Sequence, residues 1–174
     1  MRVPLGFVFA VVFMLFAHPT PLFLSIGAGV SVIGLLIRAW SSGHIRKNKI
    51  LAISGPYAYT RNPLYVGSFI MGLGFTIAAA VWWLPVLFCI LYLGIYLPVM
   101  RVESVELTGI FGDSYSNYAA QVPLFIPRLT KFKDGENPAG PFEMELYLKY
   151  REYRAAIGLT VAFAILILKM YFLN

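Results

Sequence analysis

The chain has 174 residues, of which 59% are hydrophobic and 13% are charged, and its formal net charge is +6. Soluble domains carry about 25% charged residues on average, so this composition excludes an ordinary soluble protein and indicates one integral membrane domain. The basic residues flank hydrophobic stretches, which favours contact with an anionic membrane leaflet over nucleic-acid binding.

Five hydrophobic stretches predict an all-α, polytopic membrane protein, because only a helix satisfies its own backbone hydrogen bonds in lipid. The first stretch is followed by His18-Pro19 and not by a small-residue cleavage site, so we expect it to be retained as a span. The third and fourth stretches are separated by almost nothing, which predicts an antiparallel helical hairpin. The predicted spans are residues 3–17, 22–40, 63–80, 82–100 and 155–173.

The charges predict the topology of the spans. Thirteen of the 14 lysines and arginines border the loops on one side, and all eight acidic residues lie between Glu103 and Glu152 on the same side. The positive-inside rule makes this side cytoplasmic. We therefore expect any chemistry at the cytoplasmic face, where segment 101–154 is too polar to cross the membrane. Residues 142–154 within it are predicted to form an amphipathic surface helix.

Cysteine and histidine chemistry has little support in the sequence. Cys89 is the single cysteine and lies inside an apolar run, so a disulfide within the chain is excluded. His18 and His44 lie far apart and have no paired ligands nearby. We therefore predict no metal site.

The loop before the third span is the first candidate for a binding site. Residues 55–67 read GPYAYTRNPLYVG. Gly55-Pro56 predicts a tight turn, and Asn62-Pro63 predicts the start of the third helix. Tyrosine rings attract organic cations, and a helix N-terminus offers backbone donors to a polar group. An aromatic belt at the membrane interface, with a simple helix cap, is the alternative reading.

The cytoplasmic end of the fourth span is the second candidate. Glu103 and Glu106 are three residues apart and share a helix face. Acidic residues near the hydrocarbon boundary are unfavourable without partners, which makes them functional candidates. The alternative is a solvated helix end with an Arg–Glu pair that includes Arg101. A third segment, residues 111–127, predicts a surface helix and a turn in a position to close a pocket.

Together, in this order, the three segments resemble the isoprenylcysteine carboxyl methyltransferases and their bacterial and phospholipid-methylating relatives. Asn62 stands where that family usually has a histidine, Ser104 where it has a second glutamate, and Lys49 where it often has another histidine. Asparagine does not titrate near neutral pH, so the resemblance implies no acid–base role at residue 62. The matching residues are Gly55-Pro56-Tyr57, Arg61-Asn62-Pro63-Leu64-Tyr65-Val66-Gly67, Glu103, Phe111-Gly112, Tyr115, Tyr118, Val122-Pro123 and Ile126-Pro127.

The resemblance implies a membrane-bound methyltransferase that binds S-adenosylmethionine and methylates a lipophilic acceptor. Glu103 would meet the polar end of the cofactor. Gly72-Leu73-Gly74 matches a Gly-x-Gly of the phospholipid-methylating relatives, although helix packing is the simpler explanation of these glycines. The residues that would line the cofactor are Lys49, Leu51, Ala52, Tyr57, Asn62, Pro63, Leu64, Tyr65, Gly72, Gly74 and Glu103.

Methyl transfer from a sulfonium is an in-line displacement, so it needs alignment and desolvation more than it needs a base. We predict catalytic roles for Arg101, Glu103 and Glu106. Arg101 would hold a carboxylate or thiolate acceptor, whereas Glu106 would accept the proton of a neutral amine.

Two other functions stay open at this point. One is an NADPH-dependent membrane reductase of the sterol-reductase type, and the other is a non-enzymatic membrane scaffold. Transport is disfavoured, because the middles of the predicted helices carry almost no polar groups. The acceptor class is also open: phospholipid amines, small thiols and quinone or isoprenoid acids all suit the pattern.

Overall fold

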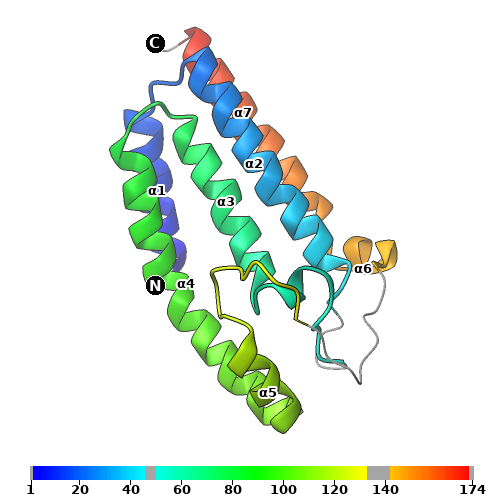
Figure 1. The fold of residues 1–174 in the computed structure, drawn as a ribbon. Coiled ribbons are helices and arrows are strands. Elements are labelled where there is room, and N and C mark those ends of the chain that lie inside the picture. The colour runs from blue at the N-terminus through cyan, green and yellow to red at the C-terminus, as the bar shows by residue number, and fades with distance from the viewer. Residues whose placement is uncertain (1, 46–49, 133–141, 173–174) are drawn as a thin grey trace.

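A computed structural model describes residues 2–45, 50–132 and 142–172 of the chain. Within these ranges the fold is all-helical, with seven α-helices, one 3-10 helix and no strand, which confirms the all-α part of the predicted fold class. Figure 1 shows the helices in chain order from blue to red. They are α1 (Arg2–Phe16), α2 (Pro21–Ser42), η1 (Gly55–Ala58), α3 (Pro63–Ile77), α4 (Trp83–Phe111), α5 (Asp113–Gln121), α6 (Met144–Lys149) and α7 (Tyr153–Phe172).

Three of the described helices, α2, α4 and α7, are long and apolar enough to cross a membrane. α1 and α3 are apolar but have 15 residues each. At about 1.5 Å per residue, each is roughly 22 Å long, against a hydrocarbon core of about 30 Å. The crossing of the membrane by α1 and α3 therefore stays a prediction.

Two helices differ in extent from the predicted spans to which they correspond. α3 ends at Ile77 and not at residue 80, because the chain turns there and Ala80 adopts a φ of +57°. α4 continues to Phe111 and does not end at residue 100, because the first residue that breaks it is Gly112, with a φ of +56°. Figure 1 shows α4 changing direction part-way along. Pro98, which has no amide hydrogen to donate, lies inside it.

The predicted amphipathic helix over residues 142–154 is also wrong in extent. α6 covers only Met144–Lys149, and Arg151 interrupts the helix with a φ of +55°. The turn after α6 places Glu152 against α2, where Nη2 of Arg38 lies 2.8 Å from its Oε2. This ion pair, with Ser68 of α3 also hydrogen-bonded to Arg38, joins the start of α7 to the α2–α3 pair.

α2 and α3 pack backbone against backbone. A Cβ on Gly74 would lie 2.5 Å from the Ser31 nitrogen, and a Cβ on Gly67 would lie 2.7 Å from the Gly34 carbonyl oxygen. The Ser31 hydroxyl donates to the Met71 carbonyl at 2.9 Å. Small residues that permit such close approach are typical of helix contacts in membranes. This pair is the frame on which the other elements are placed.

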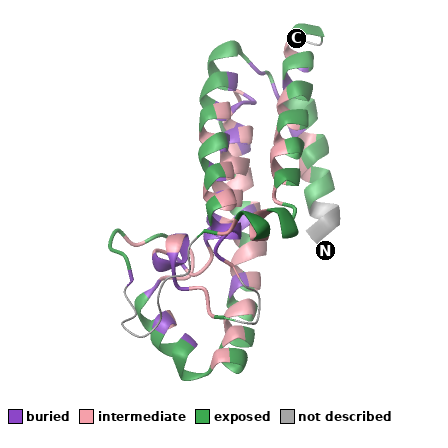
Figure 2. Ribbon diagram, turned by 90° about the vertical axis from the view of Figure 1, so that its right-hand side faces the viewer, coloured by how far each residue is buried: buried purple, intermediate pink, exposed green. Residues whose placement is uncertain are grey.

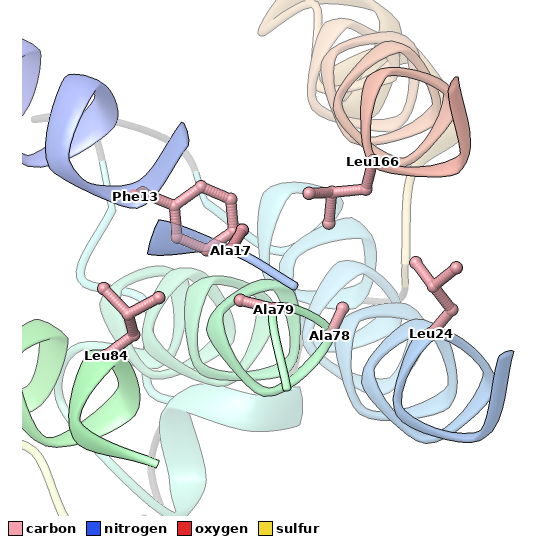
Figure 3. Packing of buried hydrophobic residues seen from close by; sticks show 7 residues of the cluster. All are labelled: Phe13, Ala17, Leu24, Ala78, Ala79, Leu84 and Leu166. Atoms are coloured by element: carbon pink, nitrogen blue, oxygen red, sulfur yellow. The ribbon is translucent and has the colours of Figure 1, made fainter. Parts of the chain in front are cut away.

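A hydrophobic cluster joins four helices at the end of the bundle where α3 passes into α4. Figure 3 shows the side chains of α1, α2, α4 and α7 meeting around the two alanines that follow α3. Lys169 of α7 is buried beside this cluster, and its Nζ donates to the Met14 carbonyl at the end of α1. The cluster consists of Phe13, Ala17, Leu24, Ala78, Ala79, Leu84 and Leu166.

Much of each long helix is exposed, as the green stretches of ribbon in Figure 2 show, and many of the exposed side chains are large and apolar. Leu36 of α2 is 62% exposed, and only 6% of the spanning window of α7 is buried. Extended apolar surface of this kind is rare on soluble monomers and marks contact with a membrane or a partner. The composition and the three long apolar helices together indicate a membrane protein.

Candidate active site

The polar end of the molecule, residues 50–62 and 101–132, carries the candidate site. Its first wall is η1, where Gly55 has a φ of +57°, a conformation that favours glycine. The ring of His44 packs on this turn, and a Cβ on Gly55 would lie 2.6 Å from its Nε2. Nδ1 of His44 donates to the Trp40 carbonyl at 2.9 Å, so the end of α2 orients the ring. The turn that presents Tyr57 is therefore braced against α2.

The 122–132 loop holds the residues that link η1 to α3. The Thr60 hydroxyl, the Arg61 amide and the Asn62 side-chain amide each donate to a carbonyl within residues 123–125, at 2.9–3.0 Å. In return, the amides of Arg128 and Phe132 donate to the carbonyls of Tyr59 and Ala58 at 2.9 Å. Asn62, the residue in the place of the family's histidine, is thus a donor to the loop.

α4 and α5 form the opposite wall. Glu103 is half-buried and Glu106 is exposed, one helical turn apart on α4. Gly112 then reverses the chain, so that α5 packs back against α4. The Tyr118 hydroxyl donates to the Tyr57 carbonyl at 2.7 Å and connects the two walls. A small core under the site consists of Ile53, Ala58, Tyr115, Tyr118, Val122 and Phe132.

Arg61 lies in a polar network that lacks a carboxylate. Its Nη1 lies 3.1 Å from the Ser104 hydroxyl and 3.4 Å from the Tyr115 hydroxyl, and Tyr115 donates to Ser104 at 2.9 Å. Ser104 occupies the position where the resemblance leads us to expect a glutamate. The Arg61 Nε is buried and has no hydrogen-bond partner among the described residues.

These walls enclose a cavity of about 300 Å³. That volume lies at the lower end of the range for small-molecule sites, about 300–1,000 Å³. Its lining combines tyrosine rings, aliphatic side chains, one guanidinium and two carboxylates. The residues are Ile45, Ile50, Leu51, Ala52, Tyr57, Arg61, Asn62, Pro63, Leu64, Tyr65, Glu103, Glu106, Leu107, Ile110, Phe111, Tyr115 and Tyr118.

Two tyrosine hydroxyls in this lining are protonated donors at neutral pH. Burial raises the pKa of Tyr57 far above its usual range, and Tyr118 and Glu103 raise it further. Burial likewise raises the pKa of Tyr118. Tyr118 uses its proton in the bond to the Tyr57 carbonyl. The Tyr57 hydroxyl is buried and unpartnered within the described part of the chain, so the cavity offers a donor without an acceptor.

A second, more open hollow of about 460 Å³ adjoins the first. The two share Tyr65, Glu103 and Glu106. The second hollow adds an aliphatic wall on α4, formed by Ile95, Pro98, Val99 and Val102. An apolar surface on a candidate membrane helix thus leads directly to the two carboxylates.

Nine of the predicted site residues meet at the first cavity. Tyr57, Tyr65 and Glu103 face one shared space, although they come from three different elements. The nine are Leu51, Ala52, Tyr57, Asn62, Pro63, Leu64, Tyr65, Glu103 and Glu106.

The other predicted residues lie elsewhere. Gly72 faces the Phe88 ring and Gly74 faces α2, so both serve helix contacts and neither lines a hollow. Arg101 is exposed and lines neither hollow. Lys49 lies outside the described residues.

Several lining residues were not predicted from the sequence. Those on α4 could have been found from the helical spacing that starts at Glu103. Glu103, Glu106, Leu107 and Ile110 follow the i, i+3, i+4, i+7 spacing of one helix face. Arg61 was noted as part of the family-like motif but was given no role in the site, although it is the single described cation in the cavity lining. Tyr115 and Tyr118 reach the site only because Gly112 reverses the chain.

Comparison with known proteins identifies the family of the chain. The family model for phospholipid methyltransferases matches residues 22–114, more than half of the chain, and this segment includes η1, α3 and both glutamates. The chain belongs to the phospholipid methyltransferase family. This confirms, at the level of the family, the resemblance found in the motifs. No solved structure matches the chain.

Curated relatives of this phospholipid methyltransferase family member have diverse names. It is 35% identical to the cobalt-zinc-cadmium resistance protein CzcN of Cupriavidus metallidurans, over 76% of the chain and 64% of that protein. It is 32% identical to protein-S-isoprenylcysteine O-methyltransferase of Schizosaccharomyces pombe, over 60% of the chain and 47% of that protein. It is 34% identical to methanethiol S-methyltransferase of Crocosphaera subtropica, over 43% of the chain and 28% of that protein. The chain therefore spans about half the length of the curated relatives it matches.

Proposed function

We propose that this chain is a membrane-bound methyltransferase that uses S-adenosylmethionine and methylates a lipophilic acceptor. The observation that carries the proposal is the single cavity shared by Tyr57, Asn62, Tyr65 and Glu103, with unpartnered polar atoms buried in its wall. Membership of the phospholipid methyltransferase family supports the reaction class.

The residues present fit the chemistry of this cofactor. Its amino-acid end is a zwitterion, and the cavity offers complementary groups. The Tyr57 hydroxyl and the Arg61 Nε are buried donors without partners among the described atoms, which suit a carboxylate. Glu103 suits the ammonium group. Tyrosine rings suit the positively charged sulfur. The buried donors are costly when nothing accepts from them, so a bound carboxylate would stabilise this wall.

The cofactor, when bound, supplies an electrophilic methyl group on a sulfonium. The work of this chain is then to hold the reacting groups in line and to exclude water. Tyr65, Glu103 and Glu106 are the residues placed for this, because they border both hollows.

The second hollow is the proposed place of the acceptor. Its aliphatic wall on α4 would hold the lipophilic part, and its shared carboxylates would face the reacting head. For an amine acceptor, Glu106 would accept the released proton. The proposal gives Arg101 no role in this reaction, because that residue lines neither hollow.

We also propose that α1 and α3 cross the membrane with α2, α4 and α7, and that the site opens to the cytoplasm. With five alternating spans, thirteen of the 14 basic residues would lie on one side, and the positive-inside rule then supports this orientation. A cofactor would then arrive from water, while the acceptor would arrive from the bilayer along α4.

Ligand binding to the purified protein in detergent tests the cofactor. S-adenosylmethionine should raise the melting temperature, because a ligand that binds the native state stabilises it, and NADPH should not. Glu103→Gln should weaken binding of S-adenosylmethionine roughly tenfold or more in calorimetry. Arg101→Gln is the matched control and should bind as the wild type does. Stabilisation by NADPH alone would overturn the proposal.

The acceptor is found by a product screen. Purified protein is incubated with isotope-labelled S-adenosylmethionine and a total lipid extract, and labelled products are identified by mass spectrometry. We expect a labelled lipid whose yield falls in Glu106→Gln if the acceptor is an amine. Failure to label any lipid, with normal cofactor binding, would contradict the lipophilic acceptor but not the cofactor.

A further inference from the structure

The 122–132 loop exposes large apolar side chains that the candidate site does not use. Leu129 is 99% exposed and Ile126 is 76% exposed, although neither lies in a helix. Single exposed apolar residues are ordinary on protein surfaces. Here two of them stand three residues apart on one short loop, with Pro127 exposed between them.

The backbone of this loop is fixed, so the exposure is built into the fold. Arg128 closes the loop on itself, because its Nη1 donates to the Gln121 carbonyl at 3.0 Å and its Nη2 to the Thr130 hydroxyl at 2.9 Å. The backbone amide of Arg128 also donates to the Tyr59 carbonyl, and that of Phe132 donates to the Ala58 carbonyl in η1. Ile126 and Leu129 are thus held outward by a braced loop.

The loop also lies beside an apolar helix. The Phe125 ring packs edge-on against Phe69 of α3, with ring centroids 5.6 Å apart. Phe69 stands six residues after Pro63, where α3 begins, which is about 9 Å along the helix. Figure 1 shows the loop, in yellow, rising against the start of α3 and the neighbouring part of α4. The part of the loop around Phe125 therefore lies beside the apolar first half of α3.

We infer that the 122–132 loop is a wedge in the membrane interface, with Ile126 and Leu129 inserted among the lipids of an anionic leaflet. Apolar side chains inserted next to basic ones are typical of interfacial anchors. Exposed Lys131 and the guanidinium of half-buried Arg128 stand beside the wedge, where anionic head groups attract positive charge.

The wedge has a consequence for the cavity. The carbonyls of residues 123–125 accept the hydrogen bonds of Thr60, Arg61 and Asn62, and the last two of these line the cavity. Lipid that holds the loop therefore also holds the cavity wall. This inference concerns the lipid contact of the loop and stands whether or not the chain transfers methyl groups.

Site-directed spin labelling measures the insertion. Cys89 is the single cysteine, so Cys89→Ser gives a background for Ile126→Cys and Leu129→Cys. The labelled protein is placed in vesicles of equal parts phosphatidylcholine and phosphatidylglycerol. Both labels should be more accessible to oxygen than to a water-soluble nickel chelate. Leu36→Cys on the apolar face of α2 gives the lipid reference, and Ser116→Cys on the exposed face of α5 gives the aqueous one.

Two outcomes would overturn the inference. Labels at 126 and 129 that match Ser116→Cys in nickel accessibility would place the loop in water. Labels shielded from both reagents, with dipolar broadening between them, would show that a second copy of the chain covers the loop.

Hydrogen exchange tests the link to the cavity wall. In the double variant Ile126→Ser/Leu129→Ser, the backbone amide hydrogen of Arg61 should exchange severalfold faster than in the wild type in the same vesicles. In detergent micelles, which adapt to the loop, the difference should shrink. Equal exchange of this amide in vesicles would overturn the link, even if the spin labels report insertion.

Discussion

The α2–α3 pair and the polar end are built in opposite ways. In the pair, backbone approaches backbone, so that a Cβ on Gly34 would lie 2.5 Å from the Gly67 carbonyl oxygen. At the polar end, a 3-10 turn, a loop and a short helix are joined by individual hydrogen bonds around an empty space of about 300 Å³. A close-packed pair leaves no room for a ligand. A cavity persists at the polar end because its walls are attached to a rigid pair.

The connection between the two regions runs through the first turn of α3. α3 begins at Pro63, and Gly67, one turn later, packs against the backbone of α2. The packing of α3 on α2 therefore also positions Asn62, Leu64 and Tyr65. A change in the frame should therefore disturb stability and the cavity together. A change in the polar end should affect the cavity with a smaller loss of stability.

The largest effect is expected from Gly34→Ala in the frame. The added Cβ would clash with backbone atoms of Gly67 and Met71, which do not move without moving α3. Overpacking of this kind costs about 3 kcal/mol of unfolding free energy. Unfolding titrations in detergent measure the loss, and binding of S-adenosylmethionine should fall with it.

Gly29→Ala is the matched control in the same helix, because a Cβ there meets nothing within 4 Å. It should leave the free energy of unfolding close to that of the wild type. Equal stability of the two variants would contradict the close packing of α2 against α3.

Tyr118→Phe should have the next largest effect. It removes the buried hydroxyl that donates to the Tyr57 carbonyl at 2.7 Å and leaves that carbonyl without its partner. We expect a loss of about 2 kcal/mol in the free energy of unfolding. Tyr153→Phe, at an exposed position, is the control. A Tyr118→Phe variant as stable as this control would mean that the bond does not join the two walls.

Asn62→Asp should have a smaller effect on stability. The substitution keeps the shape of the side chain but replaces the amide that donates to the Leu124 carbonyl at 3.0 Å. We expect a loss of about 1 kcal/mol, because this position is only half-buried. Asn62→His, the residue usual in the family, restores a donor, and we expect it to lose less. The same unfolding titrations rank the three proteins, and the opposite order would contradict the donor role of Asn62.

The sequence was sufficient for one class of feature, which is local. The turn at Gly55, the helix start at Pro63 and the shared face of Glu103 and Glu106 follow from rules that span a few residues. Arg101 lines neither hollow, and the same rule accounts for its position. It stands two residues before Glu103, and such pairs point to different sides of a helix.

Other features depend on contacts between distant segments. The hydropathy of α4 falls at Arg101, but its helix continues because nothing breaks the backbone before Gly112. The network of Arg61, Ser104 and Tyr115 forms only after Gly112 turns α5 back. No local pattern marks the direction of that turn. The glycines at 72 and 74 are a further example. Their Gly-x-Gly spacing is compatible with helix packing and with close approach of a ligand, and only their neighbours in the fold distinguish the two.

Tyr57→Phe should have the smallest effect on stability and still reduce cofactor binding. The hydroxyl is buried without a partner, so its removal should change the free energy of unfolding at pH 7 by less than about 0.5 kcal/mol. If the hydroxyl donates to the cofactor carboxylate, affinity should fall roughly tenfold.

The pH dependence of stability gives an independent reading of the same variant. Burial raises the pKa of Tyr57 above the unfolded value of about 10. As pH rises past about 10, the unfolded chain releases this proton first, so the stability of the folded protein falls. Tyr57→Phe lacks this proton, and its stability should decline less steeply between about pH 10 and 11. A parallel decline in the two proteins, or a loss at pH 7 as large as that of Tyr118→Phe, would mean that the hydroxyl is solvated or already paired. The cavity would then lack the free donor on which cofactor recognition by Tyr57 depends.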